Sequence, residues 1–429
     1  MRILFKHLDV PDIGNIDVYL REGGYKGLEK ALKEMTPDQV TEAVAKSGLR
    51  GRGGAGFPTG RKWAFIPKAP GPKYLCCNAD ESEPGTFKDR ELILRNPHQL
   101  IEGMAICCYA IGASRAFIYI RGEFVEPARK LDRALGEAYD RGFIGARVLG
   151  SDFSVDMTIY RGAGAYICGE ESGLLNSLEG QRGEPRVRPP FPAIKGLYAS
   201  PTVVNNVETL ANVPHIIING PEWFASIGTP KSTGTKIFCV SGHVNRPGNY
   251  ELPMGIPARE LIFDHAGGIP GGKRLKAWIP GGSSVPMLSA EHLDVGLDFE
   301  SLTSVGSMLG SAGLMVMNED TCIVRATLNL ARFYAHESCG KCTPCREGTA
   351  WLRDMIGTIE HGAGRMDFID KLVDVADNID GRTLCALGDA AAQPVLSSIK
   401  LFRDEYETHI RGGRCPFDGN GGFALRRNA

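Results

Sequence analysis

Four cysteines in the C-terminal part of the chain have the spacing of iron–sulfur ligands. Cys339, Cys342 and Cys345 are each separated by two residues, and Cys385 follows much later. Three thiolates in a C-x2-C-x2-C run can occupy three corners of a cubane, and a distant cysteine can supply the fourth. Structural zinc sites usually combine two separated C-x2-C pairs, or cysteine with histidine. The spacing therefore favours a [4Fe–4S] cluster, with Cys415 as the alternative to Cys385 for the fourth ligand.

A glycine-rich run near the N-terminus suggests a phosphate-binding loop. Gly51, Gly53 and Gly56 satisfy G-x-G-x-x-G, but a predicted helix precedes them, whereas the dinucleotide fingerprint follows a strand. Consecutive glycines still let backbone N–H groups approach a phosphate, and Lys62 can neutralise it. The aromatic residues at positions 57, 63 and 65 can stack on a base or flavin. Taken alone, the run is equally consistent with a glycine-rich surface loop.

Three further segments place polar side chains where α/β sheets bind ligands. Residues 78–86 are acidic and follow a predicted strand, so their carboxylates can accept ribose hydroxyls, although a solvated turn is the simpler reading. Residues 161–174 read as a strand, a glycine turn and a helix that carries Glu170 and Glu171. Asn205 and Asn206 can bond to a flavin edge or a phosphate, or can cap the helix that follows them.

The length, charge, hydropathy and cysteine count of the chain limit the class of protein to which it can belong. The chain has 429 residues and a net charge of −1, which suggests several domains and gives no reason to expect a nucleic-acid or anionic-membrane partner. The most apolar stretch, residues 103–111, is too short to span a bilayer and reads as a buried helix. The N-terminus has no apolar signal segment, so we do not expect secretion. Twelve cysteines then indicate a reducing compartment, where the cysteines outside the quartet are ordinary buried residues.

The elements that must position these residues fall into three zones. Residues 1–235 alternate helices with strands, which predicts a parallel sheet. Residues 236–320 have short strands around one helix, which predicts a small β-grasp domain. Residues 321–429 are helical and predict a bundle, with the cysteine triplet between its first two helices and an extended tail from 412.

Individual elements follow from the hydrophobic pattern. We expect strands at 74–77, 116–120, 156–160, 236–241, 250–252, 276–279 and 314–317. We expect helices at 37–46 (capped by Thr36), 100–111, 127–141, 257–266, 320–337, 348–361, 366–379 and 390–402.

Taken together, the motifs resemble one family. The segments are RGRGGAGFPTGRKW at 50–63, NADESEPGTFKDR at 78–90, RGAGAYICGEES at 161–172, PTVVNNVET at 201–209 and SCGKCTPCREG at 338–348. In this order they closely resemble the NADH-binding flavoprotein subunit of bacterial respiratory complex I. The family often has Thr-Ala after the two glutamates, where this chain has Ser172 and Gly173.

The resemblance implies a fold and a set of site residues. The fold is a Rossmann-like FMN and NADH domain, a ubiquitin-like β-grasp domain and a four-helix bundle that holds the cluster. The FMN site is lined by Gly51, Gly53, Lys62, Asn78, Asp80, Tyr166, Gly169, Val204, Asn205, Asn206 and Thr209, and Gly54 and Glu81 join the cofactor-binding set. Phe57, Phe65 and Phe191 stack on the adenine of NADH, Lys195 lies near its phosphates or ribose, and Glu83, Glu170 and Glu171 position its ribose and nicotinamide. The cluster is bound by Cys339, Cys342, Cys345 and Cys385.

The resemblance also implies an activity and a setting. NADH gives a hydride to FMN, without a protein acid or base, and electrons pass singly through the [4Fe–4S] cluster toward quinone. The implied partners are a small thioredoxin-like [2Fe–2S] subunit, a large multi-cluster iron–sulfur subunit and the rest of the peripheral arm. The implied location is the cytoplasmic side of the inner (plasma) membrane, without direct membrane insertion. Acids beside the ribose favour NADH over NADPH. The alternatives are a diaphorase subunit of an NAD-reducing hydrogenase or NAD-linked formate dehydrogenase, and a non-catalytic nucleotide- and zinc-binding scaffold.

Overall fold

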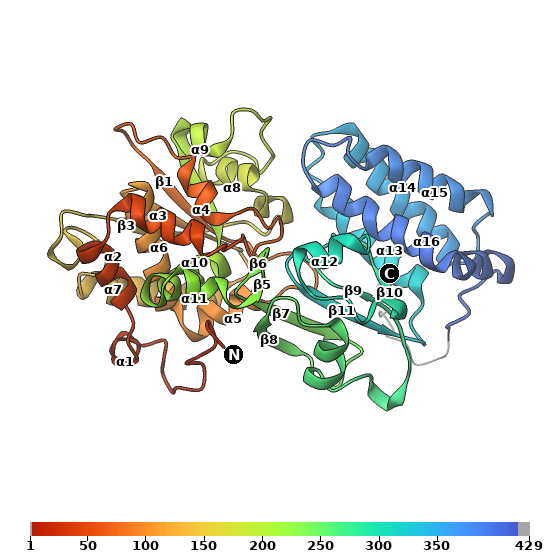
Figure 1. Ribbon diagram of the computed structural model, residues 1–429. Helices are drawn as coiled ribbons and strands as arrows, with labels where there is room; N and C mark the ends of the chain where they lie inside the picture. Colours follow the sequence, from red (N-terminus) through yellow and green to blue (C-terminus); the bar gives the residue numbers. More distant parts are fainter. Residues whose placement is uncertain (1, 419–429) are drawn as a thin grey trace.

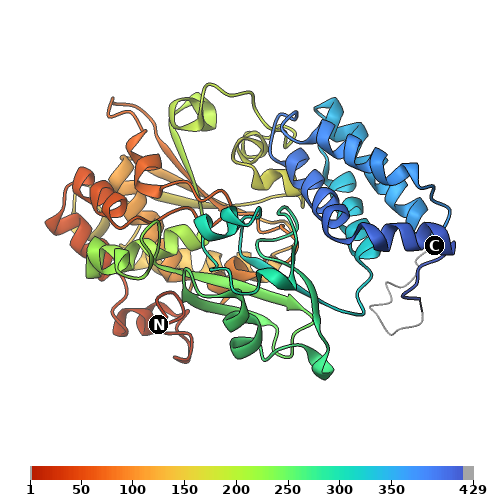
Figure 2. The ribbon, with the colours of Figure 1, turned by 45° about the vertical axis from the view of Figure 1, so that its right-hand side comes forward.

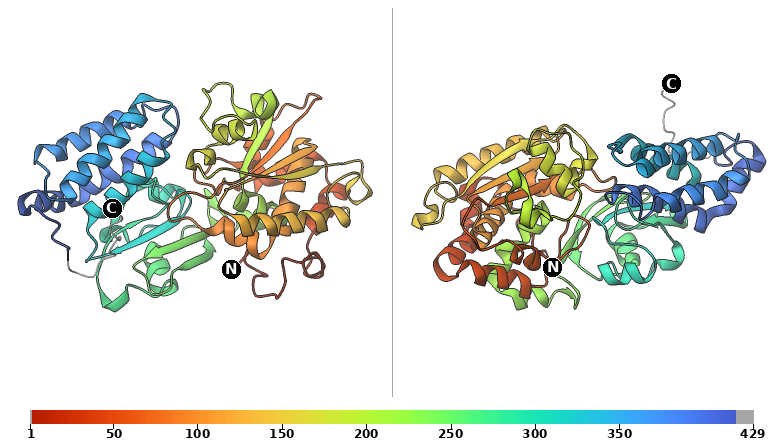
Figure 3. Two further views of the ribbon diagram at one scale, coloured as in Figure 1. Left: turned by 180° about the vertical axis from the view of Figure 1, so that it is seen from behind. Right: turned by 90° about the horizontal axis from the view of Figure 1, so that it is seen from above.

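The computed structural model describes residues 2–418, which form three packed parts. In Figure 1 an α/β part lies at the left, a helical bundle at the upper right and a small mixed-sheet part below the bundle. The views from behind and above separate the same three parts (Figure 3). Within the described residues, no helix has both the length and the apolar character needed to cross a membrane.

The first part is built on a four-stranded parallel sheet of order β3-β2-β1-β4. Its strands are β1 (Tyr74–Ala79), β2 (Arg115–Ile120), β3 (Asp156–Arg161) and β4 (Thr202–Asn206). The chain runs outward from β1 through β2 to β3 and then returns to the other side of β1 as β4. The strand order therefore reverses between β1 and β4, and in such sheets ligands bind outside the carboxyl ends of the strands at that point.

The two faces of this sheet are covered by different partners. Neighbouring residues of a strand point to opposite faces, so Cys77 belongs to the core made with the helices of this part, whereas Cys76 belongs to a second cluster that includes residues of α8 and of the bundle. The helices of this part are α1 (Ile16–Arg21), α2 (Lys26–Glu34), α3 (Pro37–Lys46), α4 (Thr59–Ala64), α5 (Lys88–Arg95), α6 (Pro97–Ile111), α7 (Val125–Asp140), α8 (Glu171–Leu178), α9 (Pro192–Lys195), α10 (Val207–Asn219) and α11 (Pro221–Ala225). The predicted cap of α3 is confirmed, because Thr36 and Gln39 form a reciprocal capping box.

The second part is a five-stranded sheet of order β10-β9-β11-β7-β8. It contains β7 (Thr235–Gly242), β8 (Gly248–Pro253), β9 (Leu275–Ile279), β10 (Leu288–Ser289), β11 (Gly313–Asn318) and α12 (Phe299–Ser304), after a short ribbon of β5 (Gly228–Thr229) and β6 (Ser232–Thr233). The helix predicted at 257–266 is present over residues 258–265, and Glu260–His265 has π-type bonding. Pro257, just before it, forms a bridge to Gly296.

The third part is a four-helix bundle, as predicted. Its helices are α13 (Ile323–Glu337), α14 (Thr343–Glu360), α15 (Asp367–Ile379) and α16 (Leu387–Gly412). Their mutual packing is visible in Figure 2. The second helix begins earlier than predicted, because Pro344 is tolerated in a first helical turn. The fourth continues beyond the predicted end at Phe402, where a non-helical φ of −138° produces a kink. The extended tail predicted from 412 is helical or turned up to 418, and its remainder lies outside the described residues.

Buried contacts hold the three parts together. A cluster with Ile279 and Met287 from the second part and Ile323 and Leu330 from the bundle joins those two parts. The fold class expected from the sequence is thus confirmed. The domain boundaries at 235 and 320 remain our proposal; β7 begins at Thr235 and α13 at Ile323.

Candidate cofactor site

The glycine loop lies over the carboxyl end of β4. The loop is closed by the bond from the Gly51 N–H to the Phe57 carbonyl (2.9 Å), and the Arg52 N–H donates to Thr209 Oγ1 (2.8 Å). A Cβ on Gly53 would lie 3.0 Å from the Asn206 Cβ, whereas Gly54 has a φ of +136° and open space beside it. Among the described residues no protein acceptor pairs with the N–H of Gly53 or Gly54. These donors beside open space fit a phosphate group.

The amides at the ends of β1 and β4 are held by the protein. Asn78 Nδ2 donates to the Gly169 carbonyl (2.8 Å), and Asn205 Oδ1 accepts from Trp63 Nε1 (2.8 Å). Asn206 Oδ1 accepts from the Glu208 N–H (3.0 Å), so the capping turn considered from the sequence is present. These bonds fix the strand ends in place beneath the glycine loop.

Two buried acids follow β1 but have different partners. Asp80 accepts from Ser82 Oγ (3.0 Å), and burial raises the pKa of its carboxyl to about 7 despite Ser82 and Arg121 nearby. Glu81 accepts from the N–H groups of Asp89 (2.8 Å) and Arg90 (3.0 Å). Burial also raises the pKa of Glu81 to about 7. Glu81 therefore serves the N-terminus of α5, and Asp80 is the acid nearer Gly169.

Glu83 lies where the three parts of the molecule meet. Its carboxylate accepts from Tyr166 Oη (2.6 Å), the Ser284 N–H (2.9 Å) and Ser283 Oγ (3.2 Å). Ser283 Oγ in turn lies 2.7 Å from Tyr334 Oη of α13. Burial raises the pKa of Glu83, while these donors oppose the rise. This hydrogen-bond junction links the loop after β1 to both other parts.

The two acids before and at the start of α8 are paired with cations. Glu170 Oε2 caps α8 by accepting from the N–H groups of Ser172 and Gly173 (both 2.9 Å), and its other oxygen pairs with Arg188. Glu171 lies 2.8 Å from Lys62 Nζ and 3.2 Å from Arg188 Nη2. Burial alone would raise the pKa of Glu171, but Lys62 and Arg188 outweigh it and lower the pKa.

The predicted adenine-stacking residues are exposed aromatic rings. Phe57 and Phe65 are 42% and 47% exposed, and their ring centroids lie 6.2 Å apart. Phe191 is 57% exposed but stacks on neither ring within the described residues, and Lys195 is exposed at the end of α9. The structure thus brings two of the three exposed rings together, with the Arg61 guanidinium carbon 6.0 Å from the Phe57 ring centroid and 5.7 Å from that of Phe65.

The four predicted cluster thiols gather at one end of the bundle. Cys339 follows α13, Cys342 and Cys345 lie at the start of α14, and Cys385 precedes α16; all four pack in one cluster. Burial raises the pKa of Cys345 to about 11, with Cys342 and Cys339 among the neighbours that raise it further. Burial raises that of Cys385 to about 12, with Cys339 and Cys345 nearby. Four close thiols in a partly apolar setting fit a cationic iron–sulfur core, which deprotonates them.

Several contacts that hold this site together were not found from the sequence. Arg182 Nη2 donates to the Cys339 carbonyl (2.8 Å), and Lys341 Nζ donates to the Pro185 carbonyl (2.7 Å). With Arg188, these contacts tie the segment 182–188 both to the cysteine loop and to the acids of α8. Their only sequence signal is a basic, proline-rich stretch between two motifs, which does not indicate a partner.

The charged group beneath the glycine loop was also missed. Glu208 is fully buried and pairs with Lys236 and with Lys88 (2.9 Å). Burial would raise its pKa, but Lys236, Lys88 and Arg52 lower it to about 2. This carboxylate anchors the first turn of α10, and thus Asn206 and Thr209, to the second part.

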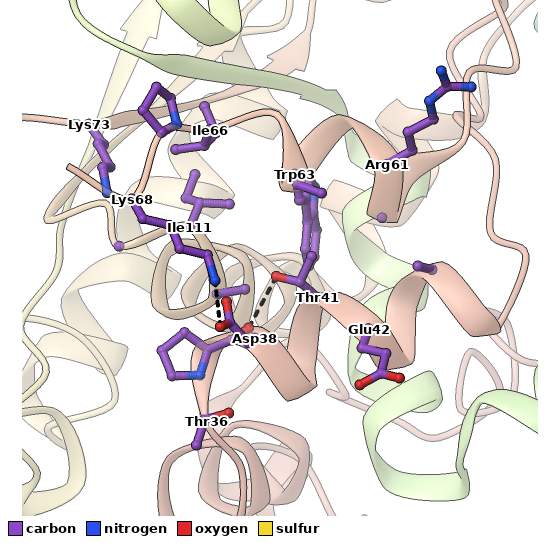
Figure 4. A pocket seen from close by; sticks show the side chains of 17 residues that line it. Thr36, Asp38, Thr41, Glu42, Arg61, Trp63, Ile66, Lys68, Lys73 and Ile111 are labelled. Atoms are coloured by element: carbon purple, nitrogen blue, oxygen red, sulfur yellow. Dashed lines mark hydrogen bonds and ion pairs between the residues drawn. The ribbon is translucent and has the colours of Figure 1, made fainter.

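One hollow of the molecule lies elsewhere. It has a volume of about 610 Å³ and is lined by α3, α4 and the end of α6, including Trp63, Lys68 and Ile111 (Figure 4). Of the candidate ligand-binding residues, only Trp63 lines it. The candidate cofactor site is therefore the set of residues at the strand ends and not this hollow.

A doubly wound sheet with a glycine loop at its switch point, packed against four thiols, defines a flavin- and iron–sulfur-containing oxidoreductase. Matches to known protein families agree with this class. Residues 44–215 match the Nuo51 FMN-binding domain, 236–306 the SLBB domain, and 325–409 the NADH-ubiquinone oxidoreductase-F iron-sulfur binding region.

Individual proteins are similar over almost the whole chain. The second NADH-quinone oxidoreductase F subunit (F 2) of Rhizobium meliloti (strain 1021) is 55% identical over 97% of this chain and 99% of that protein. The NADH-quinone oxidoreductase F subunit of Streptomyces coelicolor is 58% identical over 97% and 92%. One chain of a solved NAD+-reducing [NiFe]-hydrogenase in the air-oxidised state is 38% identical, with a TM-score of 0.83, over 96% of this chain and 67% of that one. The chain belongs to the family of NADH-quinone oxidoreductase F subunits.

Proposed function

We propose that this chain is the NADH-oxidising subunit of an NADH-quinone oxidoreductase, with FMN and a [4Fe–4S] cluster as its cofactors. One observation carries the proposal: the cluster thiols belong to the same packed apolar cluster as Cys76, Val204 and Tyr166. The proposed flavin site and the one-electron site thus adjoin one another. When bound, FMN supplies a two-electron hydride acceptor and the cluster supplies a one-electron acceptor.

The protein's own contribution is binding and orientation. We propose that the N–H groups of Gly53 and Gly54 hold the flavin phosphate, because they lack protein acceptors and adjoin open space. The other proposed FMN contacts are Gly51, Lys62, Asn78, Asp80, Glu81, Tyr166, Gly169, Val204, Asn205, Asn206 and Thr209. Of these, Glu81 acts indirectly, through α5.

The proposed NADH contacts adjoin the FMN contacts, since Glu171 pairs with Lys62 (2.8 Å) and Glu83 accepts from Tyr166 Oη (2.6 Å). Phe57 and Phe65, with Phe191 arriving from the segment before α9, offer ring faces to adenine, and Lys195 supplies a cation. Glu170 and Glu171, oriented by Arg188, position the ribose and nicotinamide together with Glu83. We expect NADH to be preferred over NADPH because these carboxylates repel a 2′-phosphate. Equal turnover rates with both nucleotides at low concentration would contradict this preference.

As a member of this family, the chain works with other subunits. We propose a small thioredoxin-like [2Fe–2S] subunit and a large multi-cluster iron–sulfur subunit as its neighbours. We also propose the peripheral arm at the cytoplasmic side of the plasma membrane as its place. A diaphorase role in an NAD-reducing hydrogenase is the alternative; it is not favoured, because the NADH-quinone oxidoreductase relatives are more similar to this chain.

The test is an anaerobic NADH titration of the purified chain with its small iron–sulfur partner. We expect flavin bleaching together with a low-temperature EPR signal of a reduced [4Fe–4S] cluster. Cys385→Ala should abolish that signal, whereas Cys415→Ala, a matched change of the alternative ligand, should retain it. Bleaching without a cluster signal in the parent would leave a simple flavin diaphorase, and absence of bleaching would reject the nucleotide site.

A further inference from the structure

A second set of metal-ligating side chains lies inside the bundle, away from the cluster thiols. It consists of Cys322, Glu360, His409 and Cys415, whose ligand atoms all lie within 4.8 Å of one another. All four residues are buried, with exposed fractions of 6%, 7%, 0% and 3%. A group of two thiols, an imidazole and a carboxylate with almost no solvent contact requires a chemical explanation.

This quartet occupies the opposite end of the bundle from the cluster thiols. Cys322 is the N-cap of α13, Glu360 is the last residue of α14, His409 lies in the last turn of α16, and Cys415 follows α16. The cluster thiols lie at the other ends of these same three helices. The quartet therefore cannot be an outer shell of the cluster. The matched iron–sulfur region, residues 325–409, leaves out both Cys322 and Cys415.

The distances within the quartet are those of a small coordination shell. Cys322 Sγ lies 3.3 Å from His409 Nε2 and 3.5 Å from Glu360 Oε2, and the latter two atoms are 3.2 Å apart. Ligands about 2.0 to 2.3 Å from a tetrahedral zinc ion are separated from each other by roughly 3.3 to 3.8 Å. Three of the four side chains thus stand at about the distances that a zinc ion would impose, and the Cys415 thiol lies within 4.8 Å of each of them.

Neighbouring groups orient three of the four side chains toward the centre. His409 Nδ1 lies 2.7 Å from the Glu405 carbonyl, so Nδ1–H donates there and Nε2 presents its lone pair to the quartet. Arg325 Nε donates to Glu360 Oε1 (2.6 Å), which leaves Oε2 to face inward. The Arg325 N–H also lies 3.3 Å from Cys322 Sγ. Such outer contacts commonly set the tautomer and orientation of metal ligands.

The backbone around the quartet is tightly fitted. A Cβ on Gly362 would lie 2.0 Å from the Gly413 carbonyl oxygen, and both glycines have positive φ values, +77° and +62°. Beyond them, Arg325 Nη2 pairs with Asp418 Oδ1 (2.6 Å). The turn after α14 and the segment after α16 are thus pressed together, which places Cys415 beside the other three ligands.

We propose that Cys322, Glu360, His409 and Cys415 bind one Zn²⁺ ion that ties the start of α13 to the ends of α14 and α16. Two sulfurs, one nitrogen and one oxygen suit zinc, whereas Mg²⁺ and Ca²⁺ select oxygen ligands. Since the protein fills all four tetrahedral positions and buries them, the ion is structural and not catalytic. Cys415 thereby acquires a role other than that of cluster ligand.

The first test measures the unmutated protein. The full chain, with its iron–sulfur partner and without a histidine tag, is purified from zinc-supplemented cells in chelator-free buffer. Elemental analysis should then find about one zinc per chain bound at this site. X-ray absorption at the zinc edge should report two sulfur neighbours at about 2.3 Å and two nitrogen or oxygen neighbours at about 2.0 to 2.1 Å. Absence of zinc, or a Cys322–Cys415 disulfide detected by mass spectrometry, would overturn the proposal.

Variants locate the ion. Cys322→Ser and His409→Gln should each lose the zinc while retaining flavin and cluster iron, and that retention also shows that the variants fold. Cys385→Ala is the matched control, which should lose cluster iron but retain zinc. Zinc that persists in both quartet variants would be adventitious and would overturn the proposal. The Glu360→Gln variant, which keeps side-chain volume, should lower zinc occupancy at limiting zinc even if the thiol variant is unstable.

Discussion

The two ends of the helical bundle present sulfur ligands in opposite ways. At the end that faces the sheet, three of the four thiols are partly exposed and only Cys345 is buried. At the far end, Cys322, Glu360, His409 and Cys415 are all buried. A redox centre must exchange electrons with neighbours, so it lies at a domain boundary under a thin cover. A structural metal ion must instead be enclosed by protein ligands. Burial, rather than ligand chemistry alone, therefore separates the two proposed roles.

The largest expected effect tests the exposed end. Cys342→Ser should remove a cluster ligand and reduce NADH-driven turnover with quinone in the assembled complex by about 100-fold or more, because electrons can no longer leave the flavin singly. Flavin bleaching by NADH and the zinc content should stay unchanged. A loss of zinc in this variant would show that the two ends are not independent.

The next effect tests the buried end. In His409→Gln the zinc is lost, and the free energy of unfolding should fall by about 2.7 kcal/mol if free zinc stands at 100 times its dissociation constant. The measurement is chemical unfolding followed by the helical signal. His361→Gln is the control, since this exposed histidine lies at the same end and should change stability by no more than about 0.5 kcal/mol. Equal losses of unfolding free energy in both variants would contradict a specific role of His409 in binding zinc.

We expect a pH dependence of the unfolding free energy that is intermediate in size. It arises from Asp80, near the end of the bundle that faces the sheet. Glu337, at the end of α13, is among the groups that raise the pKa of Asp80, after burial and Glu123; burial dominates, and the folded pKa is about 7. An unfolded aspartate titrates near 3.9, so the folded state holds this proton more tightly. The stabilisation is complete below about pH 4 and is lost as pH rises through 7.

The comparison of the parent with Asp80→Asn measures this effect. Between pH 5 and pH 8 the parent should lose about 2 kcal/mol of unfolding free energy relative to the variant. Denaturant midpoints at the two pH values supply the difference. Parallel behaviour of both proteins would mean that Asp80 does not carry a raised pKa.

We expect the smallest effect on stability from a substitution between the two ends of the bundle. Lys371 on α15 pairs with Asp367 (2.8 Å), and both side chains are about half exposed. Solvent screens such pairs, so Lys371→Ala should change stability by no more than about 0.5 kcal/mol and should alter neither iron nor zinc content. A larger effect would place an energetic link between the ends along α15.

The same contrast explains what the sequence could predict. Cys339, Cys342 and Cys345 lie within two turns of chain, so their spacing alone indicated a cluster. The parallel strands were equally visible, because alternating helices and strands are a local pattern. By contrast, Cys322 and Cys415 are brought together only by the packing of α13 against α16, and no local spacing reports that.

Residues whose role depends on tertiary packing could not be predicted from the sequence for the same reason. Arg188 pairs with Glu170 and Glu171 across a loop, and Tyr334 reaches Ser283 from another part of the molecule. The helix predicted from 348 in fact begins at Thr343, and Pro344 lies in its first turn. The extension of α16 to Gly412 buries Tyr406 and His409 and packs Ile410 against the bundle core, but the kink at Phe402 interrupts the helical pattern that the sequence was read by.

The hydrogen-bond junction around Glu83 bears on the order in which the chain is synthesised and folds. It joins Glu83 and Tyr166 to Ser283 and Tyr334. Proteins are synthesised from the N-terminus, and their domains fold largely in that order. Glu83 and Tyr166 therefore leave the ribosome long before Ser283 and Tyr334 exist. Until about two thirds of the chain has been made, the loop after β1 lacks the serine donors that hold it, and Tyr334, which bonds to Ser283, follows later still. A chain truncated before the bundle would therefore leave this hydrogen-bond junction incomplete, however well its sheet had folded.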